Sequence, residues 1–261
     1  MSNYLIFIDL DGTLRNSSRQ ISTQTKEILK KTIDKNNRII ITSGRDLMYL
    51  KPIIKSLNIE DYLIASDGAV IYNLKEEKII KEIFINEEDL KLILSKIGKS
   101  TYTATNSEKS YYNINKNSEE LPKISKITIK DKNKKTILKL IDILKKQENI
   151  HISNYSRYLI DNKNKPTFYY IDIINKKASK GSSAEYLYNL LKYKKKKTIA
   201  LGDSINDISL FQKVGYKVAM GNAISKLKEI SDEITLTNNE NGVKAYLEKL
   251  LKGWYYENRN N

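Results

Sequence analysis

Two carboxylates stand directly after an apolar stretch near the N-terminus, where a buried strand is expected. Asp9 and Asp11 follow the run at 4–8, and Gly12 and Thr13 come next. Glycine permits a tight turn, and threonine can hydrogen-bond locally. Burying charge is costly unless it is paired, hydrogen-bonded or bound to a metal. The segment is therefore either a turn capped by aspartates or part of a cation site.

A second pair of acids follows another apolar run at 198–202. Asp203 comes directly after this run, and Asp207 opens a predicted helix four residues later. Acids also favour turns and helix N-termini for purely structural reasons. Two acid clusters at strand ends nevertheless concentrate oxygen ligands, which suit Mg²⁺ and leave room for phosphate oxygens and water. We therefore predict one Mg²⁺ site built from both pairs.

Two further positions are suited to binding an anion. Ser43 and Gly44 follow the apolar run at 38–42 and precede a helix, where free N–H groups and a hydroxyl can bind an anion. Lys180 opens another predicted helix and can neutralise a phosphate as a point charge. Each signal is weak alone, since most Ser-Gly turns are only turns and most such lysines are solvated.

The elements that carry these residues alternate between strand and helix. Short apolar runs predict buried strands at 4–8, 38–42, 62–66, 198–202 and 217–220, and helical spacing predicts helices at 23–35 and 180–193. This alternation indicates an α/β fold with a Rossmann-like, mostly parallel sheet. Ligands bind beyond the carboxyl ends of such strands. Asp9, Ser43 and Asp203 should therefore lie on one rim of the sheet.

The middle of the chain has a different pattern. Alternating strands are predicted at 101–107, 126–131, 149–156 and 167–174, with amphipathic helices at 86–99 and 133–147. We predict an inserted α+β domain at 84–176, with residues 1–83 and 177–261 forming the α/β part of the chain.

Composition limits the class of protein and its partners. The 261 residues are 40% hydrophobic and contain no cysteine, which excludes a disulfide framework and thiolate chemistry. No apolar run approaches the length of a membrane span, and no signal peptide is evident, so a cytoplasmic protein without a membrane partner is expected. The net charge of +15 raises the question of an acidic partner. We favour solvated lysines, because no nucleic-acid motif accompanies the charge.

Taken together, the motifs resemble a known family. The segments "DLDGT", "TSGR", "SKG" and "GDSINDI" occur in the order typical of the four motifs of the haloacid dehalogenase-like (HAD) phosphatases. The later "VAMGNA" and "NGV" and the large insertion resemble the Cof-type branch with its α/β cap. The resemblance implies that residues 1–83 and 177–261 form the catalytic core and that the insertion at 84–176 is the cap, or cap segment. The resemblance implies a Mg²⁺-dependent phosphatase that hydrolyses a small phosphorylated metabolite, a sugar phosphate or a cofactor phosphate, through an aspartyl phosphate.

The resemblance also implies a role for each matching residue. Asp9 would be the nucleophile and Asp11 the general acid and base. The metal would be held by the Asp9 side chain, the main-chain carbonyl of Asp11 and the carboxylate of Asp203, with Asp207 in a supporting or water-mediated position. The phosphate would be bound by Ser43, Lys180, Asn206 and main-chain N–H groups near Leu10 and Gly44.

Alternatives remain open at this point. A phosphosugar mutase of the same superfamily would use the same aspartyl phosphate, and a non-catalytic protein that binds anions or nucleic acid would have different chemistry. Asp67 replaces an asparagine of the branch and is either part of a turn joining two strands or a contact to substrate hydroxyls or a cation. The single histidine, His151, is expected to have a surface or packing role in the cap and no catalytic role. Aromatic residues are expected to pack the structure, although the cap tyrosines could line a substrate pocket; these aromatic residues are Tyr111, Tyr112, Tyr169, Tyr170, Trp254, Tyr255 and Tyr256.

Overall fold

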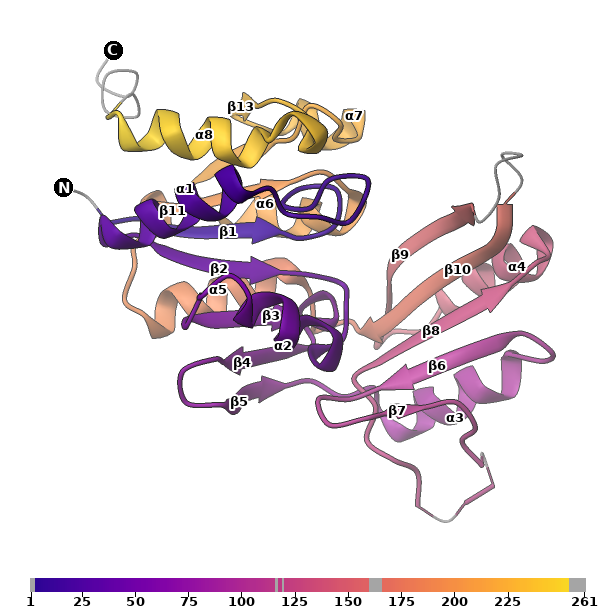
Figure 1. Ribbon diagram of the computed structural model, residues 1–261. Helices are drawn as coiled ribbons and strands as arrows, with labels where there is room; N and C mark the ends of the chain where they lie inside the picture. The colour runs from indigo at the N-terminus through magenta and orange to yellow at the C-terminus, as the bar shows by residue number, and fades with distance from the viewer. Residues whose placement is uncertain (1–2, 116, 119, 160–165, 254–261) are drawn as a thin grey trace.

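The computed structural model describes residues 3–253 apart from 116, 119 and 160–165 (Figure 1). Two separate sheets organise these residues, one of eight strands and one of five. Trp254, Tyr255 and Tyr256, which we expected to pack against the core, lie outside the described residues.

The larger sheet is mostly parallel and has β1 near its centre. Its strand order is β13-β12-β11-β1-β2-β3-β4-β5. The strands are β1 (Leu5–Asp9), β2 (Arg38–Thr42), β3 (Tyr62–Ala65), β4 (Val70–Asn73), β5 (Lys78–Glu82), β11 (Thr198–Gly202), β12 (Tyr216–Ala219) and β13 (Glu233–Ile234). Only β4 and β5 run antiparallel to their neighbours. The predicted α/β class with a mostly parallel sheet is confirmed.

The central strands are mostly apolar because helices cover the sheet. Residues 5–9 of β1 are all buried, and Ile8 pairs with Leu201 on one side and Ile41 on the other. The helices that accompany this sheet are α1 (Thr23–Asp34), α2 (Leu47–Lys55), α5 (Lys180–Leu190), α6 (Ile208–Lys213), α7 (Ser225–Glu229) and α8 (Gly242–Leu251). Helices α1 and α8 lie together over one face of the sheet (Figure 1).

Short polar side chains start several of these helices. Ser22 caps α1 by accepting the N–H of Thr25, and Asp46 caps α2 by accepting the N–H of Tyr49. Ser179 and Ser182 form a reciprocal capping box at the start of α5. The cap at Ser179 fixes where α5 begins, and so places Lys180 at its first turn.

The smaller sheet lies within the predicted cap segment and is antiparallel throughout. Its order is β7-β6-β8-β10-β9. The strands are β6 (Thr101–Thr105), β7 (Ser110–Tyr111), β8 (Lys126–Asp131), β9 (Ile150–Leu159) and β10 (Pro166–Asn175), and the helices are α3 (Glu87–Lys96) and α4 (Lys134–Leu144). The limits of the cap segment at 84 and 176 remain a prediction.

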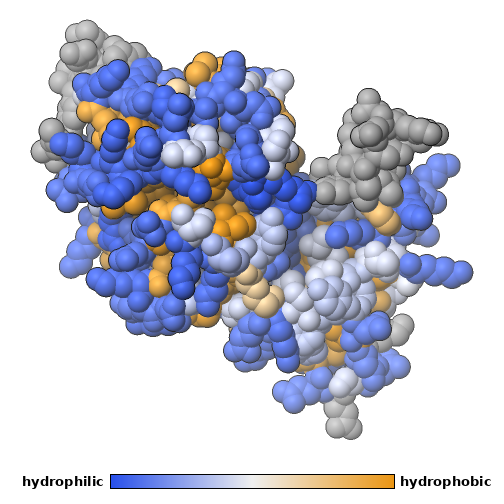
Figure 2. All heavy atoms as spheres, viewed as in Figure 1, coloured by the Kyte–Doolittle hydropathy of each residue, from blue (hydrophilic) through white to orange (hydrophobic). Residues whose placement is uncertain are grey.

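Alternation along these strands gives the smaller sheet two unlike faces. Ile127, Ile129, Ile171 and Ile173 are fully buried in a hydrophobic cluster shared with α3 and α4. The intervening residues of β8 and β10 are Lys126, Thr128, Lys130, Tyr170 and Asp172, which are polar. Figure 2 shows pale residues of intermediate hydropathy together with blue, hydrophilic residues over the smaller sheet. No helix in the described part of the chain combines the length and the apolar composition of a membrane span.

Candidate active site

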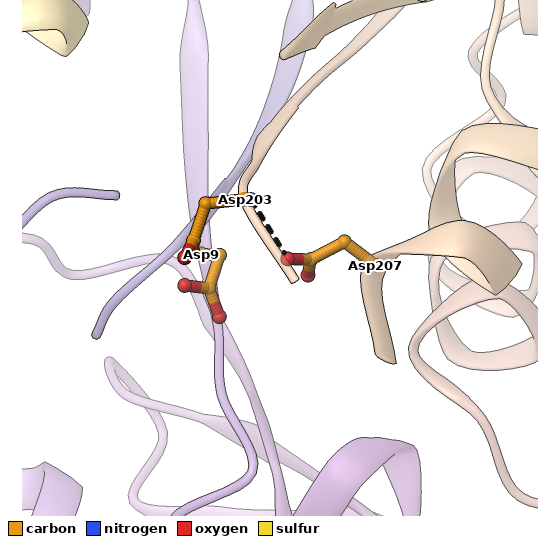
Figure 3. A group of neighbouring side chains, drawn as sticks. All are labelled: Asp9, Asp203 and Asp207. Carbon is orange, nitrogen blue, oxygen red and sulfur yellow. Dashed lines mark hydrogen bonds between the residues drawn. The ribbon is translucent and has the colours of Figure 1, made fainter. Parts of the chain in front are cut away.

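The structure brings the two predicted acid pairs to one edge of the larger sheet. Asp9 ends β1, and Asp203 follows the last residue of the neighbouring parallel strand β11. One carboxylate oxygen from each of Asp9, Asp203 and Asp207 lies within 4.8 Å of the others (Figure 3). Residues almost 200 positions apart in the sequence therefore form one carboxylate cluster.

Lys180 supplies the positive charge inside this cluster. Its Nζ lies 2.5 Å from Oδ1 of Asp9 and 2.6 Å from Oδ1 of Asp207. The side chain is completely inaccessible to solvent. A buried ammonium held by two carboxylates is directly linked to the predicted nucleophile.

Asp207 fixes the loop that presents Asp203. Its Oδ2 accepts the main-chain N–H groups of Asp203 and Ser204, each at 3.0 Å, as Figure 3 shows for Asp203. A Cβ at Gly202 would lie only 2.7 Å from Cγ of Asp207, so glycine is required for this close approach. Because Lys180 occupies the other oxygen, the hydrogen bonds of Asp207 favour an anchoring role.

The turn after β1 is fitted closely to Asp203. Thr13 donates its hydroxyl to Oδ1 of Asp203 at 2.9 Å. Gly12 has a φ of 91°, and a Cβ there would lie 2.4 Å from Oδ2 of Asp203. Glycine is needed at this position both for its left-handed conformation and for space.

Electrostatics at the cluster favour an added cation. Burial raises the pKa of Asp9 well above its usual value, and Asp207 and Asp203 add to this while Lys180 opposes it. Burial and the charge of Asp207 raise the pKa of Asp203 to about 7. Burial lowers the pKa of Lys180, but Asp207 and Asp9 outweigh it and raise the value above normal. Three carboxylates against one ammonium leave an excess of negative charge, which oxygen-seeking Mg²⁺ would offset.

Asp11 lies apart from the three clustered carboxylates. Its Oδ2 accepts a hydrogen bond from Nε of Arg45 at 2.8 Å, and its Oδ1 lies 3.3 Å from Nη1 of Arg15. Its side chain is 34% exposed, whereas the preceding Leu10 is fully buried. The carboxylate of Asp11 is thus held at the solvent-facing side of the site, and a metal contact through its main-chain carbonyl remains a prediction.

The predicted anion-binding turn lies at the end of β2. Ser43 is buried, and its hydroxyl accepts the main-chain N–H of Arg45 at 3.2 Å. The Gly44 turn is packed so tightly that a Cβ there would lie 2.8 Å from Oδ1 of Asp67. Asn206 approaches the same carboxylate, to which its amide donates at 2.8 Å.

A polar network surrounds Asp67, and no pattern in the sequence predicted it. This residue lies in the turn between β3 and β4, as expected, but it is buried and also receives a hydrogen bond from Ser153 of β9. Burial alone would raise the pKa of Asp67, but Lys126, Lys180 and two hydrogen bonds lower it overall. Lys126 gave no signal, because a lysine in an alternating strand normally faces solvent.

Among the described residues, the tyrosines and the histidine of the cap segment form no hydrogen bond to the carboxylate cluster. Tyr169 packs against the hydrophobic cluster of the smaller sheet, as does Tyr111. Tyr170 lies on the polar face, where its hydroxyl accepts a hydrogen bond from Asn154 at 3.5 Å. Tyr112 and His151 are exposed.

Comparison with protein families gives a match over nearly the whole chain. The model of the haloacid dehalogenase-like hydrolases matches residues 6–247. The chain belongs to this family. The predicted resemblance to HAD hydrolases of the Cof type is therefore confirmed.

Individual HAD proteins match over almost their full length. The 5-amino-6-(5-phospho-D-ribitylamino)uracil phosphatase YcsE of Bacillus subtilis is 30% identical, covering 96% of this chain and 95% of that protein. The structure of a haloacid dehalogenase-like hydrolase from B. subtilis has a TM-score of 0.82 at 24% identity, covering 96% of this chain and all of that one. The HAD subclass IIB sugar phosphatase BT4131 has a TM-score of 0.74 at 20% identity, covering 95% and 99% of the two chains. These structural likenesses establish a shared HAD fold.

Proposed function

We propose that this HAD hydrolase is a Mg²⁺-dependent phosphatase that acts on a small phosphorylated metabolite, a sugar phosphate or a cofactor phosphate. The observation that carries the proposal is the cluster of Asp9, Asp203 and Lys180 at the carboxyl edge of the parallel sheet. The names of the relatives support phosphoric monoester hydrolysis, since YcsE and BT4131 are both named as phosphatases.

Asp9 is the proposed nucleophile. One of its carboxylate oxygens forms a bond to phosphorus while the bond from phosphorus to the leaving oxygen breaks. A water molecule then attacks phosphorus, the bond to Asp9 breaks, and inorganic phosphate is released. Lys180 holds Oδ1 of Asp9 at 2.5 Å and thereby orients the carboxylate for this attack.

Asp11 is the proposed general acid and base. It would donate a proton to the leaving oxygen in the first step and remove one from the attacking water in the second. Its partly exposed position supports this role, because a carboxylate that is 34% exposed can exchange protons with water. Arg45 and Arg15 hold its two oxygens in place.

The carboxylates of Asp9 and Asp203 would hold Mg²⁺. When bound, the ion supplies positive charge that offsets repulsion between the carboxylate nucleophile and the phosphate dianion. Ser43, Lys180, Asn206 and the N–H groups of Leu10 and Gly44 are the proposed phosphate contacts. Asp207 would support the metal site by holding the Asp203 loop in position.

The rival readings have less support. A mutase would share the aspartyl phosphate but would transfer it to a second substrate oxygen instead of water, and the relatives named above are phosphatases. The charge of +15 supports a nucleic-acid partner only in general terms. We propose that the protein acts in the cytoplasm without a dedicated nucleic-acid or membrane partner.

The test is an activity screen against phosphorylated metabolites and p-nitrophenyl phosphate in the presence of Mg²⁺. We expect release of inorganic phosphate that EDTA abolishes, and almost no turnover by Asp9→Asn. Asp34→Asn is the matched control, because Asp34 is an exposed carboxylate in α1 and should leave turnover unchanged. Phosphate release only after a bisphosphate activator is added would favour the mutase, and tight salt-sensitive nucleic-acid binding without turnover would favour the binding protein.

A further inference from the structure

A buried lysine from the smaller sheet reaches into the candidate active site. Lys126 is the first residue of β8, and its side chain is only 9% exposed. Its Nζ donates to the main-chain oxygen of Gly44 at 2.6 Å and lies 3.1 Å from Asp172 and 3.4 Å from Asp67. Asp172 belongs to the same sheet, whereas Gly44 and Asp67 belong to the larger-sheet part of the chain. Lys126 therefore joins the two parts at the phosphate side of the site.

The contact at Gly44 acts on the anion-binding turn. A peptide unit is planar, so fixing the oxygen of Gly44 also fixes the direction of the N–H of Arg45. That N–H donates to the hydroxyl of Ser43, one of the proposed phosphate contacts. Lys126 thus constrains the turn whose hydroxyl and N–H groups would meet the phosphate.

The contact at Asp67 acts on a second part of the phosphate site. Oδ1 of Asp67 accepts a hydrogen bond from the side-chain amide of Asn206 at 2.8 Å. The main-chain N–H of Asp67 donates to the carbonyl of Ser43 at 3.1 Å. Its Oδ2 accepts the hydroxyl of Ser153 from β9 at 2.9 Å. Asp67 therefore connects Asn206 and Ser43 with two residues of the cap segment.

The chemistry of this contact suits a junction that opens and closes. Burial disfavours the charge of Lys126, but Asp172 and Asp67 raise its pKa, so the ammonium is charged at neutral pH. A buried ion pair is often no more stabilising than an apolar contact of the same size. When the two parts of the chain separate, the charged groups of an ion pair become hydrated, whereas the two halves of an apolar contact would be exposed to water at a cost in free energy. A contact made by this polar network therefore aligns the two parts without holding them together permanently.

We propose that Lys126 is a positioning residue for the phosphatase reaction. By binding Gly44 and Asp67 when the smaller sheet is docked, it aligns Ser43 and Asn206, so the phosphate site is complete only in the docked arrangement. This inference rests on the proposed phosphatase function. It assigns to the cap segment a part in binding the phosphate group itself.

The test compares Lys126→Met with Lys130→Met. Both replace a lysine of β8 on the same face of the strand, but Lys130 is exposed. We would measure kcat and KM for p-nitrophenyl phosphate with Mg²⁺, the inhibition constant of inorganic phosphate, and the melting temperature. Lys126→Arg is the second variant, because it keeps the charge but moves the donor atoms.

We expect Lys126→Met to lower kcat by about 10- to 100-fold, since small misplacements at a reacting centre have effects of this size. Phosphate should bind about tenfold more weakly. The melting temperature should also fall, because Asp67 and Asp172 lose a buried partner, but the losses of kcat and of phosphate binding should persist at temperatures where the variant is fully folded. Lys130→Met should match the wild type, and Lys126→Arg should lose activity without losing stability. Asp67→Asn should add little to Lys126→Met, because both act on the same alignment.

Unchanged kcat and phosphate inhibition in Lys126→Met would overturn the proposal. So would a loss of activity that only follows a loss of stability, with Lys126→Arg restoring both. If the wild type hydrolyses no phosphate ester, the proposed function fails by itself. Calorimetric binding of inorganic phosphate then decides the role of Lys126, with weaker binding by the variant supporting it and equal binding contradicting it.

Discussion

Replacing Lys180 with methionine removes the positive charge that, among the described residues, is bonded to Asp9, and it leaves a similar volume of side chain. The ammonium lies 2.5 Å from Asp9 and 2.6 Å from Asp207, and no part of its side chain is exposed. Removing one partner of such a buried network typically costs about 3–5 kcal/mol, because the remaining charges lose their compensation. For a chain of this size that corresponds to a fall in melting temperature of roughly 5–20 °C.

The stability that Lys180→Met loses should depend on pH and on bound metal. The pKa of Asp203 is raised to about 7 in the folded protein, above its usual value of 3.8. A raised carboxyl pKa contributes stability that is present at low pH and is lost as pH rises toward 7. Lys180→Met should therefore be least stable at pH 8 without metal. At pH 5.5 Asp203 is protonated, and fewer unpaired charges remain. The free energy of unfolding that Lys180→Met loses should therefore be smaller at this pH than at pH 8.

The assay is urea unfolding at pH 8 and pH 5.5 with EDTA, repeated at pH 8 with Mg²⁺. Lys30→Met is the control, because Lys30 pairs with Asp34 at 2.7 Å on the exposed face of α1. Exposed helical pairs of this kind contribute only about 0.3–0.5 kcal/mol. If Lys180→Met unfolds at the same urea concentration as Lys30→Met at pH 8 without metal, the described charge balance is wrong.

Two further predictions follow from the same carboxylates. Mg²⁺ should bind more tightly at pH 8 than at pH 6, because the pKa of Asp203 is about 7 and its proton competes with the ion. Calorimetric titration with Mg²⁺ at both pH values checks this, and equal affinity would contradict it. Gly12→Ala should abolish most Mg²⁺-dependent turnover, because its Cβ would lie 2.4 Å from Oδ2 of Asp203 in a backbone with φ of 91°. Gly98→Ala is the control, because Gly98 also has a positive φ, of 63°, but a Cβ there would meet no atom within 4 Å. This variant should retain turnover. Equal activity of Gly12→Ala and Gly98→Ala would show that the contact with Asp203 is unimportant.

Residues at strand ends were predictable because a parallel sheet dictates where they meet. Asp9 and Asp203 each follow an apolar run, and neighbouring parallel strands place such residues side by side. Lys180 was predictable as a charge near the phosphate, but its bonds to Asp9 and Asp207 depend on how α5 packs. The two-residue strands β7 and β13 were not predicted, since so few residues carry no periodic pattern. The strand β5 has five residues but was not predicted either, because three of them are charged.

Contacts between the two sheets were beyond the reach of local patterns. Lys126 has the polar character expected of a solvent-facing strand residue, and only the docked arrangement makes it buried. Asp67 lies in a turn between strands, which was one of its two predicted readings, yet its bonds to Asn206 and Ser153 join segments 139 and 86 residues away. Partners at such separations are set by tertiary packing, which single-sequence periodicity does not encode.

Divalent-ion binding by the wild type and Asp203→Asn tests the central claim most directly. Titration with Mg²⁺, or with Mn²⁺ followed by electron paramagnetic resonance, should show one site per wild-type chain, and Asp203→Asn should lose it while remaining folded. A wild type that binds no divalent ion, or an Asp203→Asn protein that binds it as tightly as the wild type, would contradict the assignment of this carboxylate cluster as a metal site.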